Sequence, residues 1–206
     1  MQVFFKPNLA LLSVPKTGTT AMEIALRPRA DITFNHRSKH MRAGKFHDHV
    51  APMLENLYGL TPERIAVMRN PVDHLRSWYK YRAKPSRKGK WQSTAEISFD
   101  DFVLASIERK PPAWAKVGSQ HQFLAMRDGM IPVHRLFAYE DQPQLLGFLS
   151  ERFGAPMEFP RRNVSPDVPA PISAQTENSL RAARAKDFAL YDRLLDAGGQ
   201  MCPMPV

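Results

Sequence analysis

The sequence predicts a single α/β domain over residues 1–206, arranged as a three-layer sandwich whose central sheet is mainly parallel. Two observations carry this prediction. Short, nearly continuous apolar runs, typical of buried parallel strands, alternate along the chain with segments of helical periodicity. The length of 206 residues, with 43% hydrophobic and 24% charged residues, is ordinary for one globular domain with its own core.

The first half of the chain contains three predicted strands, each followed by a predicted helix. The strands cover residues 9–14, 31–34 and 64–68, and the helices cover residues 21–26, residues 45–58 and a segment that begins at Pro71. Pro28 and Gly59 end the first two helices. The third carries Leu75, Trp78 and Tyr79 at the spacing of one helix face, which predicts core packing for all three.

The second half is predicted to complete the sandwich. After a basic loop at residues 82–93, helical patterns cover residues 99–108, 118–128, 144–153 and 177–195, and a fourth strand covers residues 131–137. Residues 155–172 are rich in proline and predict a loop wrapped on the body of the domain. Residues 201–206 predict a frayed tail.

Composition excludes several classes of protein. The lone Cys202 excludes an intrachain disulfide framework and any multi-cysteine metal site. Four histidines, at positions 36, 40, 47 and 49, are too loosely spaced to predict a metal site, so no metal is expected. No apolar run approaches the ~18 residues of a membrane span, and the first residues do not read as a signal peptide. We therefore expect a soluble, cytoplasmic protein without a transmembrane segment.

The formal net charge of +9 is concentrated in one half of the chain. Residues 1–100 hold 17 basic and 8 acidic residues, whereas residues 101–206 hold 12 of each. Such a field attracts polyanions, which include nucleic acids, acidic membranes and small phosphorylated or sulfated ligands. Charge alone does not choose among them.

The segment PKTGTT, residues 15–20, follows the first clear strand and opens a helix. Backbone N–H groups at a helix N-terminus form an anion site, Gly18 permits close approach of the backbone, and Lys16 adds a full charge. The Walker loop needs a lysine directly after its second glycine, whereas Lys16 precedes the only glycine here. The segment therefore predicts a phosphate site that differs from the nucleoside triphosphatase loop.

A second anion-binding segment, RNPVDHLRSWY, begins at Arg69. Arg69 stands at the carboxyl end of a predicted strand, where open α/β sheets bind their ligands. Ser77 lies about two helical turns into the next helix. An arginine fork and a serine hydroxyl that converge there could hold a second phosphate.

Together the two segments resemble those of the sulfotransferase superfamily, whose donor substrate is 3′-phosphoadenosine 5′-phosphosulfate. The chain looks most similar to bacterial relatives of carbohydrate sulfotransferases. The segment PKTGTT matches the family pattern without a mismatch, and the second segment keeps Arg69, Pro71, Ser77 and Tyr79 at the family spacing. His74 departs from the arginine of many relatives, although Arg76 is near. The resemblance implies that the loop after the first strand is a P-loop-like phosphosulfate site.

The resemblance also implies a role for each matching residue. Lys16 would neutralise charge on the bridging oxygen. Arg69 and Ser77 would hold the 3′-phosphate. The 5′-phosphosulfate would be held by the loop residues Pro15, Lys16, Thr17, Gly18, Thr19 and Thr20. Asn163 and Ser165, in the proline-rich loop, would close over the nucleotide, while Gln120 would either approach the donor or lie on a helix surface.

A general base must remove the proton of the acceptor hydroxyl, and histidine titrates in the required range. Lys39-His40 resembles the segment that often supplies this base in the superfamily, so His40 is preferred and His36 is second. Glu23 and Glu55 are less well placed alternatives. No metal is required, because the resemblance implies catalysis by positioning and by charge stabilisation.

The acceptor implied by the resemblance is a hydroxyl of a carbohydrate or glycolipid. The basic stretch at residues 80–90 could attract an acidic polysaccharide or could be only solvated. Two other functions remain as alternatives: a kinase-like phosphotransferase, which would need a Walker lysine and a magnesium carboxylate, and a basic nucleic-acid-binding domain, for which 82–91 is a weak candidate. No nucleic acid partner is expected, and the sequence does not indicate an oligomeric state.

Overall fold

The computed structural model describes residues 1–87, 89–159 and 168–204, and its core is a six-stranded sheet. The strand order is β3-β1-β2-β4-β5-β6. The strands are β1 (Gln2–Phe4), β2 (Leu9–Leu12), β3 (Ile32–Thr33), β4 (Glu63–Met68), β5 (Arg135–Ala138) and β6 (Gln200–Met201). The predicted α/β class is confirmed, and the strands expected around residues 9–14, 31–34, 64–68 and 131–137 are all present.

The sheet is parallel only in its centre. β2 pairs with β4 and β4 pairs with β5 in parallel, with Leu12 opposite Ala66 and Met68 opposite Ala138. β1, β3 and β6 join the edges in antiparallel pairings. The prediction of a mainly parallel sheet is therefore corrected to a mixed sheet. β1 and β6 were not predicted because they are only three and two residues long and give no long hydrophobic run, and the direction of β3 could not be predicted from its sequence.

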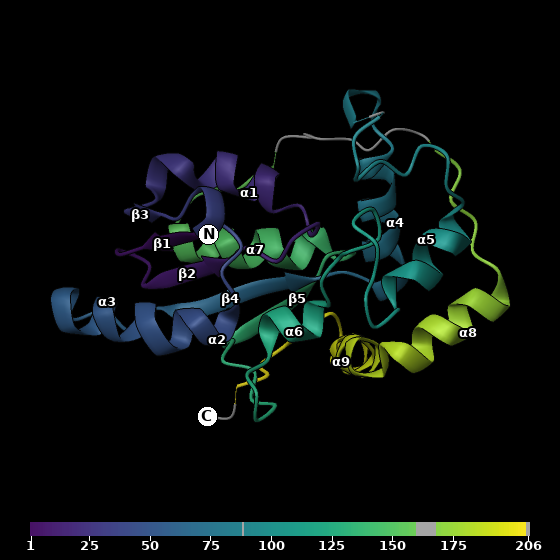
Figure 1. Ribbon diagram of the computed structural model, residues 1–206. Helices are drawn as coiled ribbons and strands as arrows, with labels where there is room; N and C mark the ends of the chain where they lie inside the picture. Colours follow the sequence, from purple (N-terminus) through teal and green to yellow (C-terminus); the bar gives the residue numbers. More distant parts are fainter. Residues whose placement is uncertain (88, 160–167, 205–206) are drawn as a thin grey trace.

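Helices cover both faces of this sheet, so three layers are present (Figure 1). One face packs on α1 (Thr19–Leu26) and α7 (Gln142–Phe153). The helical elements on the other face are α2 (Ala43–Lys45), the π-helical turn Phe46–Val50, α3 (Ala51–Tyr58), α6 (Gln120–Leu124) and α9 (Ala185–Asp196). Leu9 and Leu11 of β2 point to the first face while Ala10 and Leu12 point to the second, as the two-residue period of a strand requires.

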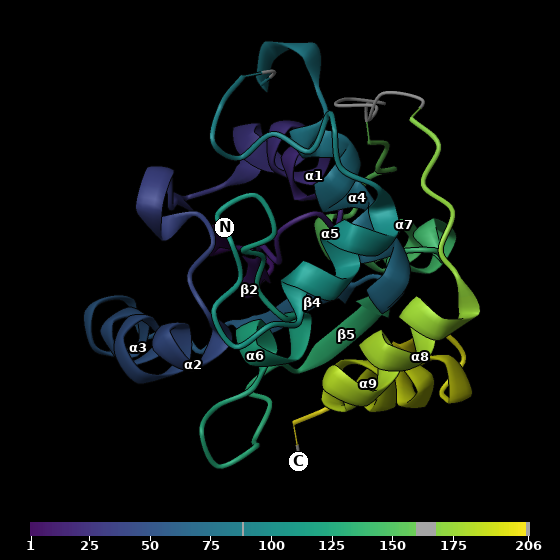
Figure 2. The same ribbon diagram turned by 45° about the vertical axis from the view of Figure 1, so that its right-hand side comes forward.

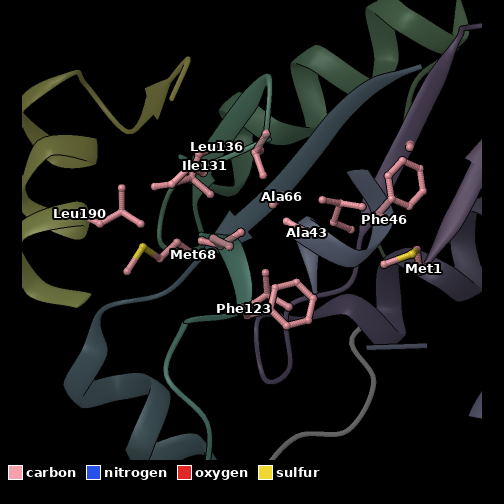
Figure 3. Close-up of a cluster of buried hydrophobic side chains, with 14 of the residues drawn as sticks. Met1, Ala43, Phe46, Ala66, Met68, Phe123, Ile131, Leu136 and Leu190 are labelled. Carbon is pink, nitrogen blue, oxygen red and sulfur yellow. The ribbon is translucent and has the colours of Figure 1, made fainter. Parts of the chain in front are cut away.

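The larger of the two face clusters is shown in Figure 3. Ala66 and Met68 of β4 meet Phe46 of the π-helical turn, Phe123 of α6 and Leu190 of α9. All five side chains are buried. Burial of a large apolar side chain contributes about 1.5–3 kcal/mol to the free energy of unfolding. This cluster therefore holds the helices of the second face on the sheet.

A third apolar cluster lies beside the sheet. It joins α4 (Pro71–Arg82), α5 (Phe99–Ser106), α8 (Ala174–Ala183) and one face of α9, which lie together in Figures 1 and 2. Tyr79 is buried there, and its hydroxyl donates a hydrogen bond of 2.7 Å to Ile97 O. Core packing is thus confirmed for Tyr79 and Leu75.

Three helical predictions need correction. The helix predicted over 118–128 is only five residues long, at α6. The helix predicted over 177–195 is two helices, α8 and α9, separated at Arg184. Met201, predicted to lie in a frayed tail, pairs with Leu136 in the sheet. Single turns of 3-10 helix occur at Arg27–Arg29, His36–Ser38 and Pro85–Arg87.

Parallel pairing brings the carboxyl ends of β2, β4 and β5 to one edge of the sheet. The segments that follow these strands begin at Ser13, Arg69 and Tyr139. Figure 1 shows α4 rising from this edge. None of the helices in the described part of the chain is long and apolar enough to cross a membrane.

Candidate functional site

The PKTGTT loop connects β2 to α1 and has an unusual backbone. Gly18 caps the N-terminus of α1 with φ of 75°, and Lys16 has φ of 67°, which is uncommon for a residue with a side chain. Thr17 is buried, and its hydroxyl donates a hydrogen bond of 2.9 Å to Val14 O. Thr19 and Thr20 form the first turn of α1. Strained residues that the surrounding structure holds in place often occur at ligand sites.

Arg69 begins the second segment, directly after β4. Its guanidinium lies 4.5 Å from the centre of the Tyr139 ring, and its Nε is buried without a hydrogen-bond partner in the described part of the chain. Asn70 then caps α4, since its Oδ1 accepts bonds from Val72 N (3.0 Å) and Asp73 N (3.3 Å). An arginine with a buried, unbonded donor is suited to bind an anion.

Tyr139 joins the two predicted segments. A Cβ atom placed on Gly18 would lie 3.0 Å from Tyr139 Cε2, and the opposite segment supplies the Arg69 guanidinium that stacks on the same ring. The loop of β2 and the loop of β4 therefore meet over the residue that follows β5. This role of Tyr139 was not predicted, although the position after a strand in the parallel centre is a signal that could have indicated it.

Gln120 fixes the backbone of Arg69. Its side-chain amide accepts a bond from Arg69 N at 2.9 Å and donates one to Arg69 O at 2.7 Å. Gln120 is almost fully buried, so the alternative that it lies on a helix surface is wrong, while its approach to the donor stays a prediction. Because it holds both backbone groups of Arg69, it positions that residue.

α4 presents aromatic side chains to the PKTGTT loop. Lys16 Nζ lies 4.2 Å from the centre of the Tyr81 ring and 5.7 Å from that of Trp78. Ser77 is on the same helix and is half-buried. Arg76, two residues after His74, pairs with Asp73 and donates to Ala170 O at 3.0 Å.

His74 links α4 to the PKTGTT loop. The ring is buried, and its Nε2 donates to Pro15 O at 3.1 Å. Burial lowers the pKa of His74 to about 3, against the opposing effect of the bond to Pro15; the nearby charges of Arg184, Arg69 and Lys16 lower it further. The ring is therefore neutral at pH 7. His74 is thus an uncharged tie between two segments of the site.

His40, the preferred base, contacts Ser13, which precedes the PKTGTT loop in the chain. Its Nδ1 donates to Ser13 O at 2.7 Å, so the proton is on Nδ1 and Nε2 can accept one. The side chain keeps an exposed edge, yet burial lowers its pKa; the bond to Ser13 raises it and the charge of Lys39 lowers it. A histidine of lowered pKa is neutral, and thus able to act as a base, at pH 7.

Glu23 anchors the segment that carries His40. Its carboxylate accepts bonds from Lys39 Nζ at 2.7 Å, from Ser13 Oγ at 2.6 Å and from the amino group of Met1. Burial acts to raise the pKa of Glu23, but these bonds outweigh it and the pKa is lowered. With its oxygens bonded to three donors, Glu23 holds Lys39, the neighbour of His40, and Ser13, whose carbonyl His40 contacts.

The remaining predicted site residues are exposed or lie outside the described part of the chain. His36 is exposed on its 3-10 turn, and Glu55 is exposed on α3. Asn163 and Ser165 lie outside the described residues. Arg82, part of the weak nucleic-acid candidate, is buried and donates to the carbonyls of Ala113, Trp114 and Lys116 at 3.2, 2.6 and 2.9 Å. Its charge is used inside the fold.

Two further findings complete the description of the site. Within residues 1–87, 89–159 and 168–204, no group of three or more histidine, cysteine, aspartate or glutamate side chains is arranged to hold a metal ion. Comparisons of the chain with protein-family models, curated proteins and solved structures found no match.

Proposed function

We propose that the chain is a sulfotransferase that moves a sulfuryl group from 3′-phosphoadenosine 5′-phosphosulfate to an acceptor hydroxyl of a carbohydrate or glycolipid. One observation carries the proposal: the PKTGTT loop and the Arg69 segment, which resemble the two donor-binding segments of that superfamily, meet over Tyr139. A small donor with phosphates at both ends needs two anion sites at such a distance that one molecule reaches both.

The donor is held by this chain's own groups. The loop amides at the N-terminus of α1 and the hydroxyls of Thr19 and Thr20 bind the 5′-phosphosulfate. Arg69 binds the 3′-phosphate with its fork of N–H donors, and Ser77 adds a hydroxyl from α4. Lys16 leaves its place over Tyr81 to neutralise the oxygen that bridges phosphorus and sulfur.

The transfer itself is an in-line displacement. The acceptor oxygen forms a bond to sulfur while the bond from sulfur to the bridging oxygen breaks, and its electron pair leaves on the 5′-phosphate. The products are the sulfate ester and adenosine 3′,5′-bisphosphate. His40 Nε2 takes the acceptor proton, because Nδ1 already carries the proton donated to Ser13 O.

Thermal unfolding with adenosine 3′,5′-bisphosphate tests the proposal directly. At 100 times its dissociation constant, this ligand should raise the free energy of unfolding by about 2.7 kcal/mol. For a domain of this size, that corresponds to an increase in Tm of about 5–10 °C. An increase with ATP and magnesium but none with the bisphosphate would favour the kinase-like alternative and refute the sulfotransferase.

Substitutions then separate donor binding from proton transfer. Arg69→Ala should lose the thermal stabilisation by the bisphosphate. His40→Ala should keep that stabilisation but lose sulfuryl transfer, measured with radiolabelled donor and a panel of sugars. His36→Ala is the matched control and should change neither. Full transfer by His40→Ala would remove His40 as the base while leaving the donor site standing.

A further inference from the structure

A cavity of about 90 Å³ opens beside the PKTGTT loop. Val14 and the first loop residue, Pro15, form one wall, and His74 and Trp78 of α4 form a second. The third wall comes from the segment around α6, and Arg42 also contributes to the lining. The residues of that third wall are Gly118, Ser119, Gln120, Gln122 and Phe123. The cavity thus adjoins the predicted reaction centre, while the function proposed above assigns none of its volume to the donor.

The lining of the cavity favours an occupant that carries a negative charge. Arg42 is the one formally charged side chain among the described residues that line it, since His74 is neutral at pH 7. No carboxylate lines it, and Arg42 has no ion pair within the described part of the chain. The indole Nε1 of Trp78 is buried without a hydrogen-bond partner among those residues. Unsatisfied donors without a nearby anion are suited to receive an acceptor group.

The size of the cavity limits what can enter. An engineered apolar cavity of about 150 Å³ holds one benzene molecule. A space of about 90 Å³ is smaller than a sugar ring but has room for a carboxylate or a sulfate ester. The cavity is partly open to solvent, so it can take a small anion or one substituent of a larger molecule whose remainder stays outside.

We infer that this cavity is a specificity subsite in which Arg42 binds an anionic substituent, a carboxylate or sulfate ester, of the sugar that accepts the sulfuryl group. The inference rests on the proposed function, because only a sulfotransferase would use the bound sugar as its sulfuryl acceptor. Arg42 comes two residues after His40 in the chain and caps α2. An acceptor anchored on Arg42 would present its neighbouring hydroxyl toward His40 and the PKTGTT loop.

Equilibrium binding of three monosaccharides tests the subsite without requiring turnover. The probes are methyl glucuronide, methyl glucoside 6-sulfate and neutral methyl glucoside, followed by NMR with and without adenosine 3′,5′-bisphosphate. The wild-type chain should bind at least one anionic probe about tenfold more tightly than the neutral one, which equals about 1.4 kcal/mol. The two anionic probes separate a carboxylate site from a sulfate ester site.

Substitutions assign the preference to Arg42. Arg42→Met should reduce the preference to less than about threefold, and Arg42→Lys should retain part of it. Arg37→Met removes an exposed arginine of the neighbouring 3-10 turn that does not line the cavity, and should keep the full preference. A wild-type chain without preference, or an Arg42→Met variant that keeps it, overturns the inference. If the preference depends on Arg42 but the bisphosphate does not bind, the anion subsite stands and the proposed function fails.

Discussion

At the scale of a single residue, two separate features require glycine at position 18: its backbone angle and its close contact with Tyr139. Its φ of 75° disfavours any side chain, and a Cβ would approach Tyr139 to 3.0 Å. Gly59 has a similar φ of 63°, but a Cβ there would meet no atom within 4 Å. The pair therefore separates the cost of the backbone angle from the cost of the collision.

We expect Gly18→Ala to lower the free energy of unfolding by about 1–3 kcal/mol more than Gly59→Ala does. Gly59→Ala alone should cost about 1–2 kcal/mol, because both positions share the left-handed backbone. Urea unfolding measures both values. An equal loss of unfolding free energy in both variants would mean that Tyr139 moves aside freely and that its contact with Gly18 is not tight.

His74 makes the protein sensitive to acid. Its pKa in the folded state is about 3, below the usual value of 6.5, so the unfolded state takes up the proton first as the pH falls. Stability that is fully present above pH 6.5 is therefore lost progressively down to pH 3. For this one residue, the loss by pH 5 should be about 2 kcal/mol.

His74→Gln tests this origin, because glutamine can still donate to Pro15 O but does not titrate. The variant should lose less stability than the wild type between pH 7 and pH 5 in urea unfolding. Some sensitivity should remain, since burial also lowers the pKa values of His40 and His134. His49→Gln, at an exposed position, is the control. An unchanged pH slope in His74→Gln would contradict a neutral, buried His74.

At the scale of an element, Arg184 divides what the sequence predicts as one helix. Its backbone leaves the helical region at φ −116° and ψ 33°, although neither glycine nor proline is present. Its guanidinium donates to Gly118 O at 3.1 Å and to Ser106 O and Val117 O at 3.3 Å. Contacts with segments 66–78 residues away therefore set this break, and no local pattern could predict it.

Arg184→Lys should lower the free energy of unfolding by about 1–3 kcal/mol, because one ammonium cannot reach three carbonyls that a planar fork spans. Arg181→Lys is the control, since Arg181 forms an exposed pair with Glu177 on α8. That change should stay within about 0.5 kcal/mol. A similar effect of both substitutions in urea unfolding would show that Arg184 does not hold the junction between α8 and α9.

The elements that the sequence did predict share a local cause. β2 and the last four residues of β4 are buried apolar runs, α1 follows a glycine cap, and α4 begins at a proline. The site was predictable to the same extent: the PKTGTT loop and Arg69 follow strands, so they could be placed from the order of elements. The position of Tyr139 after β5 could also be placed from the order of elements, but its contacts could not. The contacts of Tyr139, Gln120 and Arg42 join segments far apart in the chain.

At the scale of the whole molecule, the excess positive charge has several different uses. Arg82 donates to backbone carbonyls inside the fold, while Lys16 and Arg69 face the predicted donor site. Lys84 Nζ lies 5.6 Å from the centre of the same Tyr81 ring that Lys16 approaches, which places part of the basic loop beside the site. The charge near the donor site should therefore act on the approach of an anionic ligand as well as on its binding.

Paired charge reversals separate the local field from the net charge. Lys84→Glu with Lys90→Glu changes the loop beside the site, and Lys186→Glu with Arg193→Glu changes exposed positions of α9. Each pair lowers the formal net charge from +9 to +5, since every reversal removes two units. The loop pair should slow association of adenosine 3′,5′-bisphosphate about threefold or more in stopped-flow measurements at low salt, and raised salt should shrink that difference. The α9 pair should have a smaller effect. Equal slowing by both pairs would mean that the ligand responds to net charge, and that the basic loop has no special place in guiding it.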